Sequence, residues 1–174
     1  MNPRTKLTIF VVEDNALFNT ALKADIETTF ENMNVKVHSF DTGEACMKMF
    51  EELKPEVMIL DYNLNSKNPN AVDGIKVLDW IKKENHDTNV IILTSDDHID
   101  IAVKAFQHGA ADYVVKSETK FKKINYSIFN TIKVLEARSE ARKYKRLATG
   151  LFVSIALIVI GVSLVQFFMP SLFH

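Results

Sequence analysis

The sequence predicts an α/β domain with a doubly wound, five-stranded parallel sheet, and three observations support this fold class. Short β-rich segments alternate with helical patterns along most of the chain. Three of these segments, LTIFVV, VMIL and VIIL, are almost entirely apolar, as expected for parallel strands that helices cover on both faces. The chain length of 174 residues suits one such domain with a short appendage.

The expected elements follow one another in strict alternation. Strands are predicted at residues 7–12, 35–40, 57–60, 90–93 and 113–115, and helices at 15–32, 42–53, 74–85, 98–108 and from 118 onward. Gly109 lies where the C-terminal cap of a helix is expected. Ligands of doubly wound folds bind beyond the carboxyl ends of the strands, so the residues at those ends are the candidate site.

Carboxylate, hydroxyl and ammonium side chains follow four of the five expected strands. In chain order these residues are Glu13 and Asp14, then Asp61, Thr94 and Lys116. Three carboxylates in one pocket repel one another unless a cation lies between them, and oxygen ligands open to water suit Mg²⁺. A lysine and a hydroxyl opposite the metal would bind phosphoryl oxygens. Each residue alone has a structural alternative, such as helix capping by the acidic pair, and only their joint placement is specific.

With these residues the chain resembles the response-regulator receiver domains of two-component signalling systems over residues 5–135. The resemblance rests on the segments FVVEDN, VMILDYN, VIILTS and GAADYVVK, whose spacing is similar to that of the chemotaxis response regulator. It implies a flavodoxin-like receiver fold in which Asp61 accepts a phosphoryl group from a sensor histidine kinase or a histidine phosphotransfer protein. Such a bacterial phosphoprotein is not an enzyme, although it assists its own phosphorylation and dephosphorylation.

The resemblance also implies a set of metal ligands. Asp14, Asp61 and the backbone carbonyl of Asn63 would hold Mg²⁺, and Glu13 would hold a metal-bound water. Mg²⁺ is then the one cofactor expected for this chain.

The phosphoryl group would be contacted by Thr94 and Lys116. Thr94 and Tyr113 would form the switch, with Tyr113 as plain core filler as the alternative. Their movement would change the face made by the fourth helix, the fifth strand and the fifth helix, where the resemblance places a downstream protein partner.

Two segments depart from the family pattern. The loop NLNSKNPNAVDG after Asp61 is longer than usual, and it has Asn65 where a proline is customary. Lys116 is followed by Ser117, where the family usually has a proline with a cis bond. Because a non-proline cis bond costs roughly 3–4 kcal/mol, the turn is either trans and altered, or strained.

Charge divides the chain into an acidic domain, a basic stalk and an uncharged end. Residues 1–132 hold 15 Lys/Arg and 20 Asp/Glu, residues 133–146 hold 6 and 2, and residues 147–174 hold none. We therefore expect a receiver domain at 1–135 and a basic helical stalk at 136–146. The following residues 147–169 are predicted to form a transmembrane helix, because their helical length of roughly 34 Å exceeds a hydrocarbon core of about 30 Å. A buried core helix is the alternative.

Basic residues before this segment set its predicted orientation. These membrane-flanking residues are Arg138, Arg142, Lys143, Lys145 and Arg146. The positive-inside rule predicts a single-pass protein with the receiver domain in the cytoplasm and the tail, 170–174, outside, and the same cluster could contact membrane lipid. Nucleic acid is not expected as a partner, since no recognition motif follows the basic residues.

Small residues in the apolar segment suggest a homodimer. Gly150, Ser154 and Gly161 share one helix face, which would let two helices approach closely; incidental small residues are the alternative. The predicted function is a membrane-tethered, phosphorylation-dependent interaction switch. A phosphate sink or relay and a scaffold that takes no phosphate remain as alternatives.

Overall fold

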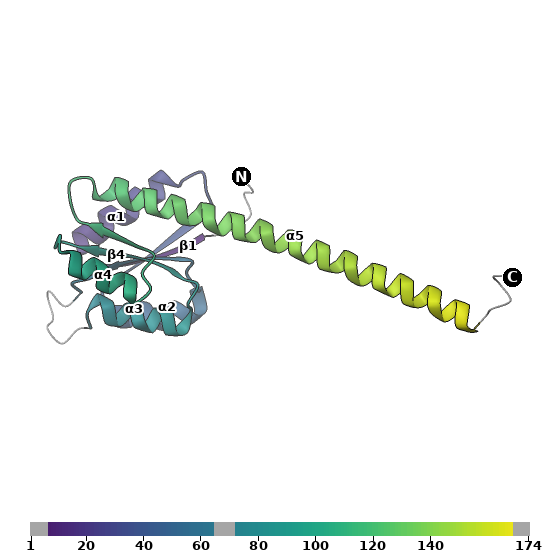
Figure 1. Ribbon diagram of the computed structural model, residues 1–174. Coiled ribbons are helices and arrows are strands. Elements are labelled where there is room, and N and C mark those ends of the chain that lie inside the picture. Colours follow the sequence, from purple (N-terminus) through teal and green to yellow (C-terminus); the bar gives the residue numbers. More distant parts are fainter. Residues whose placement is uncertain (1–6, 65–71, 169–174) are drawn as a thin grey trace. The chain divides into compact units, whose positions relative to one another are not determined.

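The computed structural model describes residues 7–64 and 72–168, and these contain the predicted parallel sheet (Figure 1). The elements in chain order are β1 (Leu7–Val12), α1 (Ala16–Thr29), β2 (Val35–Phe40), α2 (Gly43–Leu53), β3 (Val57–Asp61), α3 (Gly74–Glu84), β4 (Asn89–Thr94), α4 (Ile99–Gln107), β5 (Asp112–Val115) and α5 (Lys120–Phe168). The strand order is β2-β1-β3-β4-β5, and all neighbouring strands are parallel. The predicted fold class of a five-stranded, doubly wound sheet is confirmed.

Helices cover both faces of the sheet. Helix α1 and the first turns of α5 lie on one face, and α2, α3 and α4 lie on the other (Figure 1). On the first face, the Asn125 side-chain amide of α5 donates a hydrogen bond to Asp25 Oδ2 of α1 at 2.7 Å. On the second face, α2 and α3 approach so closely that a Cβ built at Gly43 would overlap the Val77 side chain.

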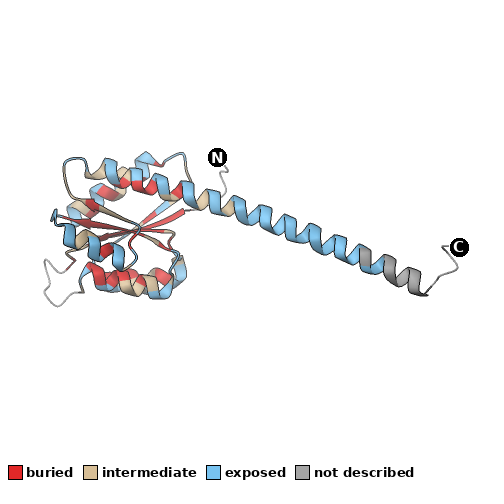
Figure 2. Cartoon of the chain, viewed as in Figure 1, coloured by how far each residue is buried: buried red, intermediate tan, exposed pale blue. Residues whose placement is uncertain are grey.

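The core follows directly from the apolar strands. Every residue of β1 and β3 is buried, and β4 is buried from Val90 to Thr94. The sheet is therefore mostly red in Figure 2, whereas the outer faces of the helices are exposed. Central strands that are buried on both faces have almost continuously apolar sequences. Strand β2 is an edge strand in which only Val37 is buried, which explains its more polar sequence.

Gly109 ends α4 as predicted. Its φ of +92° lies in the left-handed region, which glycine adopts without the steric cost of a Cβ. The Gly109 N–H donates to the carbonyl of Phe106 at 3.0 Å, which satisfies one of the carbonyl groups left unpaired at a helix C-terminus.

The chain divides into two compact units, Met1–Thr131 and Ile132–His174. Helix α5 begins in the first unit and continues to Phe168 in the second. In the second unit, large apolar side chains of α5 such as Leu147, Leu151 and Phe152 are exposed.

The predicted transmembrane helix at 147–169 requires correction. Across residues 7–64 and 72–168, the structure contains no helix whose length and apolar character would carry it through a membrane. The prediction of a single-pass membrane location is therefore wrong. Residues 169–174, including the predicted outer tail, lie outside the described part.

Roles that depended on membrane insertion lose their basis with it. These are the orientation of the receiver domain, the contact with lipid, and the membrane-flanking role of Arg138, Arg142, Lys143, Lys145 and Arg146. Helix pairing is a separate matter. A Cβ built at Gly150 or Gly161 would meet no atom within 4 Å, and the homodimer stays a prediction.

Candidate functional site

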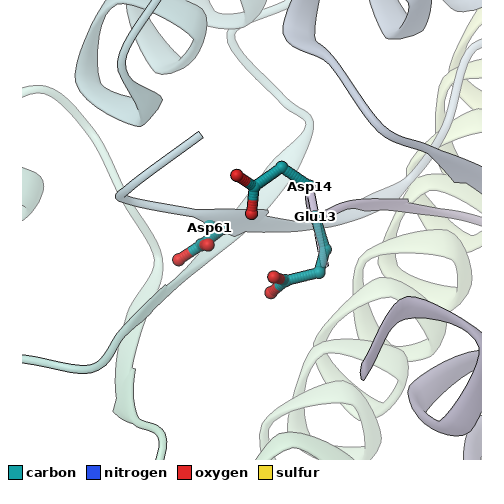
Figure 3. A group of neighbouring side chains, drawn as sticks. All are labelled: Glu13, Asp14 and Asp61. Carbon is teal, nitrogen blue, oxygen red and sulfur yellow. The ribbon is translucent and has the colours of Figure 1, made fainter. Parts of the chain in front are cut away.

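Three acidic side chains meet at the carboxyl ends of β1 and β3. The register pairs Val12 with Leu60, so Glu13 and Asp61 each come one residue later at the same edge of the sheet. Figure 3 shows the carboxylates of Glu13, Asp14 and Asp61 gathered there. One oxygen from each residue lies within 4.8 Å of the others. The sequence prediction that these acids converge therefore matches the geometry.

The N-cap of α1 is Asn15, which follows the acidic pair in the turn after β1. Its side-chain oxygen accepts hydrogen bonds from the N–H groups of Leu17 and Phe18 at 3.1 and 3.2 Å. Glu13 is only 1% exposed, and its Oε1 accepts from the Asn15 N–H at 3.2 Å. Helix capping, the structural alternative for Glu13 and Asp14, is thus fulfilled by another residue.

Lys116 brings a positive charge into this acidic cluster. Its Nζ lies 2.6 Å from Glu13 Oε2 and 2.9 Å from Asp61 Oδ2. Its backbone N–H donates to the carbonyl of Thr94 at 2.7 Å, which joins the end of β5 to the end of β4. Burial alone would lower the pKa of Lys116, but the hydrogen bond to Glu13 and the charge of Asp61 act the other way and leave the pKa raised. The ammonium is therefore held in its charged form.

Glu13 is destabilised as a carboxylate. Burial raises its pKa, the nearby charge of Asp61 raises it further, and the hydrogen bond and charge of Lys116 only partly offset these effects. One ammonium thus does not balance the acids that surround it, and an additional cation would favour the ionised form of Glu13.

The donor set fits Mg²⁺. Asp61 Oδ1 is buried and has no hydrogen-bond partner among the residues that the structure describes. Such an orphaned carboxylate oxygen, beside oxygens of Glu13 and Asp14, is the hard anionic ligand that Mg²⁺ prefers. Asn63 lies in the turn that follows β3, two residues after Asp61. This position is the one expected of a residue whose backbone carbonyl would bind the metal beside Asp61.

Because the pKa of Glu13 is raised, binding of Mg²⁺ should depend on pH. We expect the affinity for Mg²⁺ to fall as the pH is lowered through this raised pKa, since protonated Glu13 no longer offers a negative charge to the site. Calorimetric titration with MgCl₂ at intervals between pH 5 and 8 measures this. In Glu13→Gln the pH dependence should be weaker across the same range. A wild-type affinity that stays constant over this range contradicts the prediction.

Thr94 and Tyr113 both reach the turn that follows β4. Thr94 is fully buried at the end of its strand, and its Oγ1 accepts from the Asp96 N–H at 3.1 Å. The Tyr113 hydroxyl donates to the Asp96 carbonyl at 2.8 Å, while its ring packs against the core. Burial, and then the charges of Asp97 and Asp96, raise the pKa of Tyr113, so the phenol keeps its proton. Tyr113 thus packs in the core, which was the alternative for this residue, and it also contacts the turn.

The turn after Lys116 takes one of the two forms that the sequence left open. No peptide bond in the described residues is cis, so the bond between Lys116 and Ser117 is trans. The Ser117 N–H donates to the carbonyl of Val115 at 2.8 Å. The family's proline is thus replaced by an altered trans turn.

Two residues near the site were missed by the sequence analysis. Asn19 is buried on α1, and its side-chain amide donates to the carbonyls of Glu13 and Phe40 at 3.0 and 2.9 Å. It thereby fixes the end of β1 against the end of β2. Phe18 places its ring beside Lys116. An isolated asparagine on an otherwise apolar helix face is a weak signal for the first, and the sequence holds no signal for the second.

Comparison with known proteins agrees with this geometry. The model of the response regulator receiver domain matches residues 9–126. The sensory transduction protein LytT of Oceanobacillus iheyensis is 27% identical over 135 residues, covering 76% of this chain and 52% of the relative. The transcriptional regulatory protein YdfI of Bacillus subtilis is 27% identical over 123 residues, covering 69% and 54%. The chain thus spans about half the length of these curated relatives.

Solved structures show the same fold. The signal receiver domain of a protein described as a Luxo repressor, from Vibrio parahaemolyticus, aligns with a TM-score of 0.64 at 26% identity, covering 79% of this chain and 98% of that one. The BeF3-activated DrrB receiver domain aligns with a TM-score of 0.62 at 24% identity, covering 74% and 99%. The family model covers most of the chain and the sheet order and acidic cluster agree with it, so the chain belongs to the response regulator receiver domains of two-component signalling.

Proposed function

We propose that the chain is a phosphorylation-dependent interaction switch in which Asp61 accepts a phosphoryl group from a sensor histidine kinase or a histidine phosphotransfer protein. One observation carries this proposal. The buried carboxylate of Asp61 has one oxygen held by Lys116 at 2.9 Å and the other without a hydrogen-bond partner in the described part of the chain. A buried carboxylate that lies between a fixed ammonium and a candidate metal position is prepared for nucleophilic attack on an anion, because both cations would neutralise the incoming charge.

The phosphoryl transfer would be a displacement at phosphorus. An Asp61 oxygen forms the new bond to phosphorus while the bond from phosphorus to the donor imidazole breaks, and the imidazole nitrogen leaves with the electron pair. Mg²⁺ bound by Asp14, Asp61 and the Asn63 carbonyl, with Glu13 on a coordinated water, would supply charge neutralisation for the incoming anion. The protein contributes position and electrostatics rather than acid–base chemistry.

Lys116 would change partners during this reaction. Its ammonium pairs with Glu13 and Asp61 in the structure, and both carboxylates belong to the proposed metal site. A phosphoryl group on Asp61 would bring new anionic oxygens within reach of the same ammonium. Lys116 and the Thr94 hydroxyl would then bind those oxygens.

The output would pass through the turn at Asp96. Thr94 and Tyr113 hold this turn by its N–H and its carbonyl respectively, so a movement of the Thr94 hydroxyl toward a phosphoryl group would release one of the two bonds. Helix α4 follows this turn directly. Its exposed apolar side chains are Ile99, Val103 and Phe106, which share one helix face by their spacing of four and three. We propose that a downstream protein binds this face together with β5 and α5.

Thr94→Ala should separate phosphorylation from the conformational change. We expect the variant to accept phosphate at a rate within a few-fold of wild type, because Thr94 is not the nucleophile. Phosphorylation should no longer alter amide exchange across residues 98–135, because the differential contact of the hydroxyl is gone. Hydrogen–deuterium exchange with and without acetyl phosphate measures this, with Thr94→Ser as the variant that keeps the hydroxyl. Identical exchange changes in Thr94→Ala and wild type would refute the coupling.

The direct test of the proposed function is phosphorylation of the full chain with acetyl phosphate. We expect a base- and hydroxylamine-labile acyl phosphate that forms only in the presence of Mg²⁺, detected as a mass increase of the intact protein. Absence of any modification with Mg²⁺ present would refute the proposed function.

A further inference from the structure

An aromatic ring lies against the ammonium of the site lysine. Phe18, in the first turns of α1, has its ring centroid 5.0 Å from Lys116 Nζ. Phe121, at the start of α5, packs against Phe18 with ring centroids 5.6 Å apart. A second ammonium, Lys120 Nζ, lies 5.8 Å from the Phe18 ring and 5.4 Å from the Phe121 ring. These distances are within the range in which the face of a ring attracts a cation.

Lys116 needs support that its ion pairs cannot supply throughout the reaction. Its ammonium is held in the structure by Glu13 and Asp61. Those same carboxylates would be engaged once a divalent cation binds, and a cation at that place repels the ammonium. A lysine side chain has four rotatable carbon–carbon bonds and loses much conformational entropy when it is fixed. Without a further partner, Lys116 would become mobile at the moment when it must meet the phosphoryl group.

The Phe18 ring can hold Lys116 under these conditions. It carries no charge and no metal-ligating atom, so it does not compete with the carboxylates for Mg²⁺ or with the phosphoryl oxygens for space at the metal. Its attraction to the ammonium persists when Glu13 is engaged elsewhere. Phe121 packs against one side of it, with ring centroids 5.6 Å apart, so the ring has a neighbour besides Lys116.

We propose that Phe18 is a positioning residue for phosphoryl transfer, one that keeps the Lys116 ammonium beside Asp61 through a cation–π contact while the acidic residues bind Mg²⁺. This inference rests on the proposed function of Asp61. The competing explanation is that Phe18 only packs α1 against α5. The two differ in one respect, because packing needs bulk whereas positioning needs an aromatic face.

The experiment compares Phe18→Leu, Phe18→Tyr and Phe121→Leu in the full chain. Phe121→Leu is the matched control, because it removes the other ring of the same pair, for which the structure records contact with Lys120 but not with Lys116. The rate of phosphorylation by acetyl phosphate is measured with saturating Mg²⁺. This small donor does not depend on a protein docking surface. We expect about a three- to tenfold lower rate for Phe18→Leu, a rate near wild type for Phe18→Tyr, and a smaller loss for Phe121→Leu.

A second measurement reports on Lys116 itself. Protons above an aromatic face resonate upfield, so the ε-protons of Lys116, assigned by comparison with Lys116→Arg, should lie upfield in Mg²⁺-loaded wild type and Phe18→Tyr. In Phe18→Leu they should move to the position of a solvated lysine. If Phe18→Leu does not fold, the position of the Lys116 ε-proton resonance in wild type is the test. An upfield position supports the proposal, and an unshifted position contradicts it.

The outcomes separate the two proposals. Wild type that takes no phosphate refutes the function of Asp61. Wild type that takes phosphate, with Phe18→Leu reacting at the same rate or with Phe121→Leu equally slow, overturns the positioning role alone.

Discussion

Replacement of Asp61 by asparagine should abolish phosphorylation, with a fall in the rate of label incorporation from acetyl phosphate of at least about a hundredfold. The amide has nearly the same shape as the carboxylate but lacks the negative charge that makes the oxygen a nucleophile. Intact-protein mass spectrometry after incubation with Mg²⁺ and acetyl phosphate measures the effect.

The variant should remain folded, which makes the loss of labelling interpretable. Asp61 raises the pKa of the buried Glu13 by its charge, so its removal relieves a repulsion even as it breaks the ion pair to Lys116. The matched control is Asp73→Asn, an exposed N-cap whose side chain accepts from the Lys76 N–H. Asparagine caps helices about as well as aspartate, so this control should be labelled at the wild-type rate. Labelling of Asp61→Asn at that rate would assign the phosphoacceptor to another residue.

The fold could be predicted closely because the strands carry an unusually simple signal. Residues 7–12 and 35–40 were predicted with the bounds that the structure has for β1 and β2. Central parallel strands are apolar throughout and end at a polar residue, so the same pattern that marks a strand also marks its carboxyl end. For that reason the convergence of Glu13, Asp14 and Asp61 followed from the sequence once the sheet was known to be parallel.

Contacts between helices that are far apart in the sequence could not be predicted from the sequence alone. Phe18 and Phe121 are adjacent only because α1 and α5 pack on the same face of the sheet, and no spacing in the sequence encodes which side chain meets Lys116. The trans turn at Ser117 was also undecided, since the sequence shows that proline is missing but not how the chain turns without it. The error at 147–169 has another origin. The uncharged, apolar sequence of this segment predicts a membrane span, and the described part of α5 does not provide one.

Gly74→Ala should lower both the stability of the receiver unit, defined as the compact unit Met1–Thr131, and the rate at which it is phosphorylated. A Cβ built at Gly74 would overlap the carbonyl oxygen of Asp61 and lie 2.8 Å from Tyr62 Cα. Both neighbours are backbone atoms, so neither can rotate away as a side chain would. The Gly74 N–H also donates to the Tyr62 carbonyl at 3.0 Å, which ties the start of α3 to the next peptide of the same turn. The methyl group must therefore displace either α3 or the Asp61 backbone.

The expected loss of unfolding free energy is about 3 kcal/mol, at the upper end for overpacking, because the contact is with main chain. The chain has a single tryptophan, Trp80, which lies on α3 and packs against the core, so its fluorescence in a urea titration reports on the receiver unit. Phosphorylation by acetyl phosphate should fall about tenfold or more even below the unfolding transition, since small displacements of a reacting group cost large factors in rate.

Gly150→Ala is the matched control for this change. The same methyl group is added within α5, where a Cβ would meet no atom within 4 Å, and alanine favours a helix over glycine by about 1 kcal/mol. Because Gly150 belongs to the unit Ile132–His174, whereas Trp80 reports on the unit Met1–Thr131, the Trp80 transition and the phosphorylation rate should both equal those of wild type. If Gly74→Ala also matches wild type in both measurements, α3 does not approach the Asp61 backbone closely in solution. Loss of stability with an unchanged rate would instead show that the displacement is absorbed by α3, and that the position of Asp61 does not depend on Gly74.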